Sequence, residues 1–194
     1  IVDDQKIRIA FRNGFLYFLG SVAMQFPAAF ALAALLTSKH LRFKGFFRTM
    51  AFVPSVVPGS TVGVIANWFF SDRNGFFYAL YVALGGQQSF DWGLKPWFIL
   101  PSMLMMAFVL YTGSHAVFFM AGMSGISQSV IEASVVDGAN GWQRARYVIL
   151  PLLKPVLTYS LVSTMAGSLM MYEFPAMYMG VGGGPGGQGW FALP

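Results

Sequence analysis

The stretch PWFILPSMLMMAFVLYTGSHAVFFMAGMSGISQSVI, residues 96–131, is the longest uncharged run in the chain and lies between Lys95 and Glu132. Its 36 residues exceed the roughly 20 apolar residues that a helix needs to cross the hydrocarbon layer of a bilayer. A helix satisfies its own backbone groups without water, so this run predicts a membrane-spanning helix near residues 97–121.

Three more runs have the same character. Uncharged stretches of 26, 23 and 18 residues follow Arg12, Arg48 and Lys154. Hydrophobic residues make up 56% of the 194 residues and charged residues 10%, whereas soluble domains carry about 25% charged residues. The sequence therefore predicts an all-α, polytopic membrane helical bundle with spans near 14–37, 49–70, 97–121 and 152–175. It excludes a disordered chain, a nucleic-acid-binding module and an ordinary soluble enzyme.

The distribution of basic residues predicts the orientation. Four Lys or Arg residues and no acid lie in 38–48, and three basic residues lie in 122–154. In 71–96 two basic residues are balanced by two aspartates, and 176–194 has no charge. Cytoplasmic loops carry an excess of Lys and Arg, so we expect 38–48 and 122–154 inside and the other two segments outside. The basic residues near the N-terminus oppose this bias.

Prolines interrupt the predicted spans. Pro27 lies in the first span, Pro54 and Pro58 in the second and Pro101 in the third. Proline removes a backbone donor and bends a helix, and such breaks persist in membranes where neighbouring helices or a cavity satisfy the backbone. We therefore expect a packed bundle. The apolar run 76–84 is too short to cross, and we expect it at the outer interface or against the bundle.

A second informative stretch is SQSVIEASVVDGANGWQRARYVILPLLKP, residues 127–155. Ser129 and Glu132 fit an S-x-x-E capping box, which predicts a helix that begins at Val130. An Asp-Gly pair would end it, with Gly138 in a left-handed conformation. A helix of about two turns is not stable alone, so its own protein or a partner must hold it.

A second short helix is predicted directly after the first. Asn140 and Gln143 suggest its cap, and Trp142 lies in its first turn. We expect this helix to end near Pro151, where the fourth span begins.

The stretch resembles the EAA loop of permease subunits in binding-protein-dependent ABC importers. It reads Glu132-Ala133-Ser134, three residues, Gly138, nine residues, then Val148-Ile149-Leu150-Pro151. The family form is E-A-A, three residues, G, nine residues, I-x-L-P. The departures at Ser134 and Val148 are small changes in size.

Neighbouring residues resemble the carbohydrate-uptake branch of that family. These are Asp137-Gly138-Ala139, Trp142 and the segment 151–155. Ala145 and Arg146 stand where the branch usually has aromatic residues, so contacts there are expected to differ.

The resemblance implies a mechanical role. The short helix would dock as a coupling helix in a groove of a cytoplasmic ATPase, and closure of two ATPase subunits on ATP would change the side to which the bundle opens. The carboxylates of this helix could pair with basic groups of the ATPase, although capping alone would also explain Glu132. The resemblance assigns ATPase coupling to Glu132, Ala133, Ser134, Asp137, Gly138, Ala139, Leu150 and Pro151.

It also implies the partners and the location. The partners are an ATPase dimer that binds ATP and Mg, a second permease subunit, an extracytoplasmic solute-binding protein and membrane lipid, without nucleic acid. The location is the plasma or inner membrane of a prokaryote, as a multi-pass protein. No P-loop occurs in the sequence, so we expect a permease subunit, not an enzyme, that binds no cofactor itself.

The resemblance covers nearly the whole chain. Its weaker elements are Phe47-Arg48 with Pro54, Asn67-Trp68 with Gly75, the segment 113–122, and Phe174 and Tyr178 with Gly182-Gly183-Gly184-Pro185. The last group is typical of the maltose- and glycerol-phosphate-type first permease. The first and last helices of the usual six-helix core are expected to be missing from this chain. We expect the Gly-rich stretch 180–189 to form an external loop.

Four residues are candidates for a substrate pathway: Asn67, Tyr172, Glu173 and Tyr178. Tyrosine rings could stack on sugars, and Glu173 is the one acid expected at membrane depth, where carboxylates are often functional. The alternative for the tyrosines is an interfacial belt or packing, and for Glu173 it is a position in water at the interface or a hydrogen bond to Tyr172. His115 has no second ligand at suitable spacing, so we expect it to be a packing residue and predict no metal site.

The function expected from the sequence is therefore that of a transmembrane subunit of an ATP-driven importer for a sugar or sugar derivative. One alternative is an importer permease for a non-sugar solute. An ion-coupled secondary transporter would need intramembrane charges, for which Glu173 is the one candidate. A membrane scaffold without transport activity is the third alternative.

Overall fold

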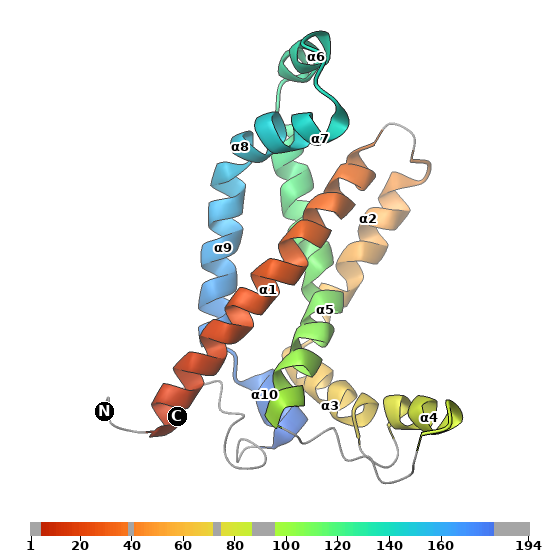
Figure 1. Cartoon of the computed structure of the whole chain (residues 1–194), viewed down its shortest axis with the longest axis vertical. Coiled ribbons are helices and arrows are strands. Elements are labelled where there is room, and N and C mark those ends of the chain that lie inside the picture. Colours follow the sequence, from red (N-terminus) through yellow and green to blue (C-terminus); the bar gives the residue numbers. More distant parts are fainter. Residues whose placement is uncertain (1–4, 39–40, 72–74, 87–95, 181–194) are drawn as a thin grey trace.

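The computed structural model describes residues 5–38, 41–71, 75–86 and 96–180, which form a helical bundle (Figure 1). Two of its helices are long and apolar enough to cross a membrane alone: α1 (Gln5–Thr37) and α5 (Pro96–Ser124). They pack against each other more extensively than any other pair of described elements. The α1–α5 pair is thus the frame on which the other helices are placed.

Two further crossings are bent helix pairs. The first joins α2 (Lys44–Phe52) and the 3₁₀ turn η1 (Val53–Val56) to α3 (Gly59–Phe69) with a bend of 88°. The second joins residues 141–152 to α9 (Lys154–Leu169) with a bend of 71°. If each bent pair is one span, the described residues hold up to four. The remaining elements are α4 (Phe76–Ala83), α6 (Gln128–Val136), α7 (Gly141–Arg144), the π turn η2 (Ala145–Ile149), α8 (Leu150–Leu152) and α10 (Glu173–Met179).

Prolines explain where the chain bends. Val57, which precedes Pro58, has extended backbone (φ −69°, ψ 127°), as a residue before proline prefers. Pro54 lies four residues before Pro58. In a continuous helix the ring of Pro58 would clash with the carbonyl of Pro54, and Pro58 has no N–H to donate to that carbonyl. By contrast, α1 and α5 continue through Pro27 and Pro101. The expectation that these two single prolines interrupt their spans is wrong, because each removes only one donor from a long helix held by packing.

The helix bounds also refine the predicted spans. α1 begins at Gln5, well before residue 14, and the predicted span 152–175 is divided between α9 and α10. The predicted loop 71–96 is described only in part, and Gly182-Gly183-Gly184-Pro185 lie outside the described residues, as does nearly all of 180–189.

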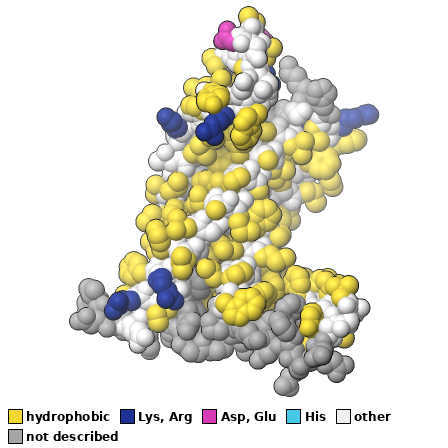
Figure 2. Space-filling view, in the orientation of Figure 1, with side chains coloured by type: hydrophobic (Ala, Val, Ile, Leu, Met, Phe, Trp, Pro, Cys, Tyr) yellow, Lys and Arg dark blue, Asp and Glu magenta, His cyan; other side chains and the backbone are white. Residues whose placement is uncertain are grey.

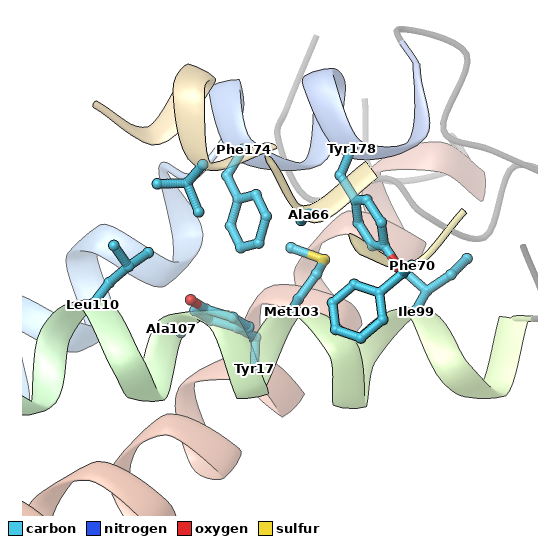
Figure 3. Packing of buried hydrophobic residues seen from close by; sticks show 10 residues of the cluster. Tyr17, Ala66, Phe70, Ile99, Met103, Ala107, Leu110, Phe174 and Tyr178 are labelled. Carbon is cyan, nitrogen blue, oxygen red and sulfur yellow. The ribbon is translucent and has the colours of Figure 1, made fainter. Parts of the chain in front are cut away.

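The core consists of two clusters along the α1–α5 frame. One joins α1, α3, α5 and α10 through large side chains such as Phe70, Met103 and Phe174 (Figure 3). The other, toward the α6 end, joins α1 and α5 through Ala29, Ala33 and Ala116 with larger residues around them. Small residues allow two helix backbones to approach closely, as in membrane bundles.

The surface has the polarity of a membrane protein. On the face seen in Figure 2, hydrophobic side chains cover the middle, and Lys and Arg lie toward the two ends. The turn after α1 and the segment from α6 to α8 lie at one end, whereas α3, α4 and α10 lie at the other (Figure 1). The two loops expected inside therefore share one end of the bundle. Arg8 and Arg12 lie near the N-terminal end of α1, the opposite end.

The short helix α4 packs on α3 through aromatic rings. Phe77 stacks on Phe70 with ring centroids 5.0 Å apart, and Phe76 lies 5.4 Å from Phe69. This agrees with the expectation that the run 76–84 packs against the bundle instead of crossing it.

α2 crosses α5 closely at Gly113. A Cβ atom built on Gly113 would overlap the carbonyl oxygen of Ala51, which is backbone and cannot rotate away. Glycine at this position therefore sets the distance between α2 and α5.

We predict that Gly113→Ala destabilises the bundle. Overpacking typically costs about 1–3 kcal/mol, against roughly 0.5–1 kcal/mol gained when alanine replaces a helical glycine. Gly45→Ala in α2 is the matched control, because nothing lies within 4 Å of a Cβ there. Thermal unfolding of both variants in detergent should give a lower Tm for Gly113→Ala only, and equal Tm values would contradict the packing described.

Candidate functional site

The helix α6 stands clear of the bundle at the tip of the molecule (Figure 1). It begins at Gln128 after an extended Ser127, not at Val130. The predicted capping box is wrong, because Ser129 already lies inside the first turn. Its Oγ is 3.2 Å from Ser127 Oγ, and Glu132 Oε1 accepts from Gln128 Nε2 at 3.1 Å. The carboxylate of Glu132 is therefore exposed and not used by the helix backbone.

The end of α6 follows the sequence expectation. Gly138 has φ +78°, its N–H donates to the carbonyl of Val135, and the N–H of Ala139 donates to the carbonyl of Ser134. These two bonds form a Schellman motif, which satisfies carbonyls at a helix end and requires a left-handed residue. Gly138 thus sets the direction in which the chain leaves α6.

The exposed surface of α6 is apolar and acidic. Val135 is 54% exposed and Val136 87%. The carboxylates of Glu132 and Asp137 flank these two valines. Ala133, whose side chain is small, is also exposed. Ser134 faces inward and donates to the carbonyl of Ile131 at 2.6 Å. A small acidic and apolar projection of this kind can enter a groove that carries basic groups.

The predicted second cap is present. Asn140 Oδ1 accepts from the backbone N–H of Gln143 at 2.9 Å, and Gln143 Oε1 accepts from the N–H of Asn140 at 2.9 Å. From this capping box the chain returns to the bundle through α7, η2 and α8. Leu150 is 38% exposed on the way, and Pro151 is exposed too. The two residues therefore lie at the base of the projection, not on α6.

A half-open cavity of about 650 Å³, with polar groups set among a mainly apolar lining, lies between α1, α5, α9 and the segment that leads into α10. Its volume is within the range of small-molecule sites. Its polar lining residues are Tyr17, Ser21, Gln25, Tyr111, Ser114, His115, Ser163, Thr164, Ser168, Tyr172 and Glu173. These side chains are neutral hydrogen-bonding groups apart from His115 and Glu173, and no lysine or arginine lines the cavity in the described part of the chain.

His115 both packs and faces the cavity. Its ring lies 5.1 Å from that of Phe26, and its Nε2 is 3.5 Å from Thr164 Oγ1. The Thr164 hydroxyl donates its proton to the carbonyl of Ser160 at 2.7 Å, so it can only accept from His115. A neutral imidazole then carries its proton on Nε2 and has an acceptor at Nδ1, which is buried without a hydrogen-bond partner in the described structure.

The structure separates the four candidates for a substrate pathway. Tyr172 and Glu173 line the cavity. Asn67 and Tyr178 do not: Asn67 Nδ2 donates to the carbonyl of Tyr178 at 2.8 Å, and the Tyr178 hydroxyl is 2.8 Å from Ser102 Oγ. These bonds tie α10 to α3 and α5. Asn67 and Tyr178 thus hold in place the helix whose N-terminus bears Glu173.

The sequence did not lead us to predict most of the residues that line the cavity, although the spacing of polar residues in two helices indicates them. Tyr17, Ser21 and Gln25 recur every four residues in the apolar α1, and Thr164 and Ser168 have the same spacing in α9. Such a polar stripe on a membrane helix faces the bundle interior. Among the described residues, no three His, Asp or Glu side chains are grouped so that they could hold a metal ion.

The family model for "Binding-protein-dependent transport system inner membrane component" matches residues 25–188. The lactose transport system permease protein LacF of Rhizobium radiobacter is 27% identical over 91% of this chain and 59% of its own length. The probable ABC transporter permease protein YesP of Bacillus subtilis is 30% identical over 94% of this chain and 58% of its own length. This chain therefore spans about 59% of the length of such relatives.

A solved structure has the same fold. It is that of a bacterial alginate ABC transporter in complex with an alginate pentasaccharide-bound periplasmic protein. The match has a TM-score of 0.72 at 20% identity and covers 87% of this chain and 59% of that chain. Since the family model covers most of the described bundle, including α6, the chain belongs to the family of binding-protein-dependent transport system inner membrane components.

Proposed function

We propose that this chain is a permease subunit of an ATP-driven importer and forms part of the translocation pathway for a sugar. The observation that carries the proposal is α6, a short projecting helix with an exposed acidic and apolar surface. It lies within the residues that resemble the EAA loop. Relatives whose names refer to lactose and arabinooligosaccharide transport support the substrate class.

In this proposal α6 is the docking element for a cytoplasmic ATPase. Glu132 and Asp137 meet basic groups, Ala133 permits close approach, and Ser134 stabilises the helix from within. Gly138 and Ala139 form the turn that orients α6, while Leu150 and Pro151 lie at its base. The partner ATPase dimer binds ATP and Mg, and a second permease subunit and an external solute-binding protein complete the importer.

The end that carries α6 is then the cytoplasmic end. The turn after α1, with Arg42 and Lys44 close to it, lies at the same end, which supports this orientation by the excess of positive charge inside. The end of the bundle that carries α3, α4 and α10 is then the outer end.

The cavity is proposed as the passage for a neutral polyhydroxylated solute. Hydroxyls, an amide and an imidazole offer both donors and acceptors, as sugar hydroxyls require. A carboxylate or phosphate on the solute would need a cation, and the cavity has none among its described lining residues, while Glu173 would repel it. Tyr172 and Glu173 act at the edge of this passage.

Uptake measurements test the proposal. The complete importer is placed in proteoliposomes with ATP on the α6 side, and uptake of a labelled neutral disaccharide is compared with that of its uronate analogue. We expect ATP-dependent uptake of the neutral sugar. Uptake that continues without ATP but stops with an ionophore would overturn the importer assignment, and equal uptake of the uronate would overturn the cavity argument.

Replacement of Gly138 tests the coupling role. In Gly138→Leu a bulky residue must adopt the left-handed conformation, which costs roughly 1–2 kcal/mol and redirects α6. Uptake should fall strongly while membrane insertion remains normal. Gly141→Ala is the control, since a Cβ meets nothing within 4 Å at either position but only Gly138 has a left-handed backbone. Normal uptake by Gly138→Leu would count against α6 as the coupling element.

Replacement of Thr164 tests the cavity. Thr164→Val removes one hydroxyl, and a lost hydrogen bond of about 0.5–1.5 kcal/mol should raise the KM for uptake roughly 2- to 10-fold. Thr158→Val is the matched control on α9, because Thr158 is exposed and does not line the cavity. The same KM for both variants would show that the solute does not contact Thr164.

A further inference from the structure

The segment that carries α6 buries one apolar side chain completely, at the point where it returns to the bundle. From residue 121 to residue 159 every position is described, and only Ser134 and Leu153 are buried. Ser134 is polar, and its hydroxyl donates to its own helix. Leu153 is the one completely buried apolar side chain of this segment, while Met123, Val156 and Leu157 are partly buried and pack against the core cluster of α1 and α5.

Leu153 packs against Gly122, a glycine of α5. A Cβ atom on Gly122 would lie 2.6 Å from Leu153 Cδ2 and 2.9 Å from Val156 Cγ2, so these side chains occupy the space that a residue with a side chain would fill. Val156 in turn packs against the core cluster that includes Ala33 and Phe119. Leu153 thus connects the returning segment to α5 and, through Val156, to the α1–α5 frame.

The chain also bends at this residue. Leu153 is both the last residue before α9 and the residue after α8, and the axes of 141–152 and 154–169 differ by 71°. Pro155 has no N–H to donate to the carbonyl of Pro151, so the hydrogen-bond ladder lacks one rung across the bend. The N–H of Leu153 still donates to Ile149, and that of Leu157 to Leu153. The bend is therefore a joint between α9 and the helical segment formed by α7, η2 and α8.

We propose that the contact of Leu153 with Gly122 is the pivot through which a displacement of α6 reaches the cavity. The inference rests on the proposed docking of α6 on an ATPase and names a positioning residue for that coupling. The contact joins the inner ends of α5 and α9, whose middle parts carry His115 and Thr164 in the cavity wall. Without the buried leucine, α6 and its return segment can move about the joint while both helices stay in place.

The test uses the complete importer in proteoliposomes and compares Leu153→Ala with Leu152→Ala. Leu152 is the adjacent residue and is 51% exposed, which makes it the matched control. In Leu153→Ala we expect normal basal ATPase activity, whereas stimulation by solute-loaded binding protein and uptake fall by about tenfold, a usual size for coupling between sites. Leu153→Met, which keeps the volume, should restore both. Unchanged stimulation in Leu153→Ala, or an equal loss in Leu152→Ala, would overturn the pivot.

If Leu153→Ala assembles poorly, a second pair of variants tests the same contact by changing Gly122 instead. Gly122→Ala crowds both Leu153 and Val156 and should reduce stimulated ATPase activity. The variant that adds Leu153→Val and Val156→Ala should recover it, because both side chains that meet the new methyl group are then shorter. Failure of this combined variant to recover activity would refute the contact as a pivot.

Crosslinking separates this inference from the proposed function. The chain has no cysteine, so Val136→Cys, at a position 87% exposed on α6, is a unique attachment point for a crosslinker. If it crosslinks to the ATPase in both the parent and Leu153→Ala importers while stimulation falls only in the latter, docking and pivot are both supported. Absence of the crosslink in the parent would refute docking itself, whereas a crosslink with unchanged stimulation would refute only the pivot.

Discussion

The backbone hydrogen bond within each helix is the constraint on which this structure depends. In hydrocarbon no water replaces a missing partner, so the chain is helical throughout its apolar runs, and departures from helical geometry must be supported by neighbouring elements. The break between α2 and α3 illustrates this. It lies beside α5, where Gly113 allows the backbone of α2 to approach so closely that no side chain would fit. A stretch with two prolines is thus accommodated by packing on a continuous helix.

The same environment explains the contrast between the two core clusters and the cavity. At one end small alanine side chains allow α1 and α5 to approach closely, and at the other end aromatic and methionine side chains fill the core. Between α1, α5 and α9, hydroxyl, amide and imidazole groups lie among the apolar residues that line the cavity. Polar groups in hydrocarbon are costly unless they face one another or a shared interior, so their convergence in one place is consistent with a pathway for a hydrated solute.

The projection at the inner end depends on a different balance. α6 is too short to be stable by itself, and it is held by its own turn at Gly138 and by the capping box of Asn140 and Gln143. Both features are local hydrogen-bonded turns that shape the projection. Attachment depends on Leu153 together with the partly buried Val156 and Leu157, and burial of one leucine side chain is worth about 1.5–3 kcal/mol.

The sequence by itself determined the helical class, the short helix with its Gly138 end and the second cap, because hydropathy, glycine conformation and side-chain caps act over a few neighbouring residues. It could not place the first cap, since Ser129 competes with Ser127 for that position and the register depends on how the chain enters α6. Only the tertiary structure decided that α1 and α5 continue through a proline, that Asn67 and Tyr178 hold α10 in place, and that polar stripes from three helices line one cavity. These outcomes depend on which helix faces meet, and that is a property of residues far apart in the chain.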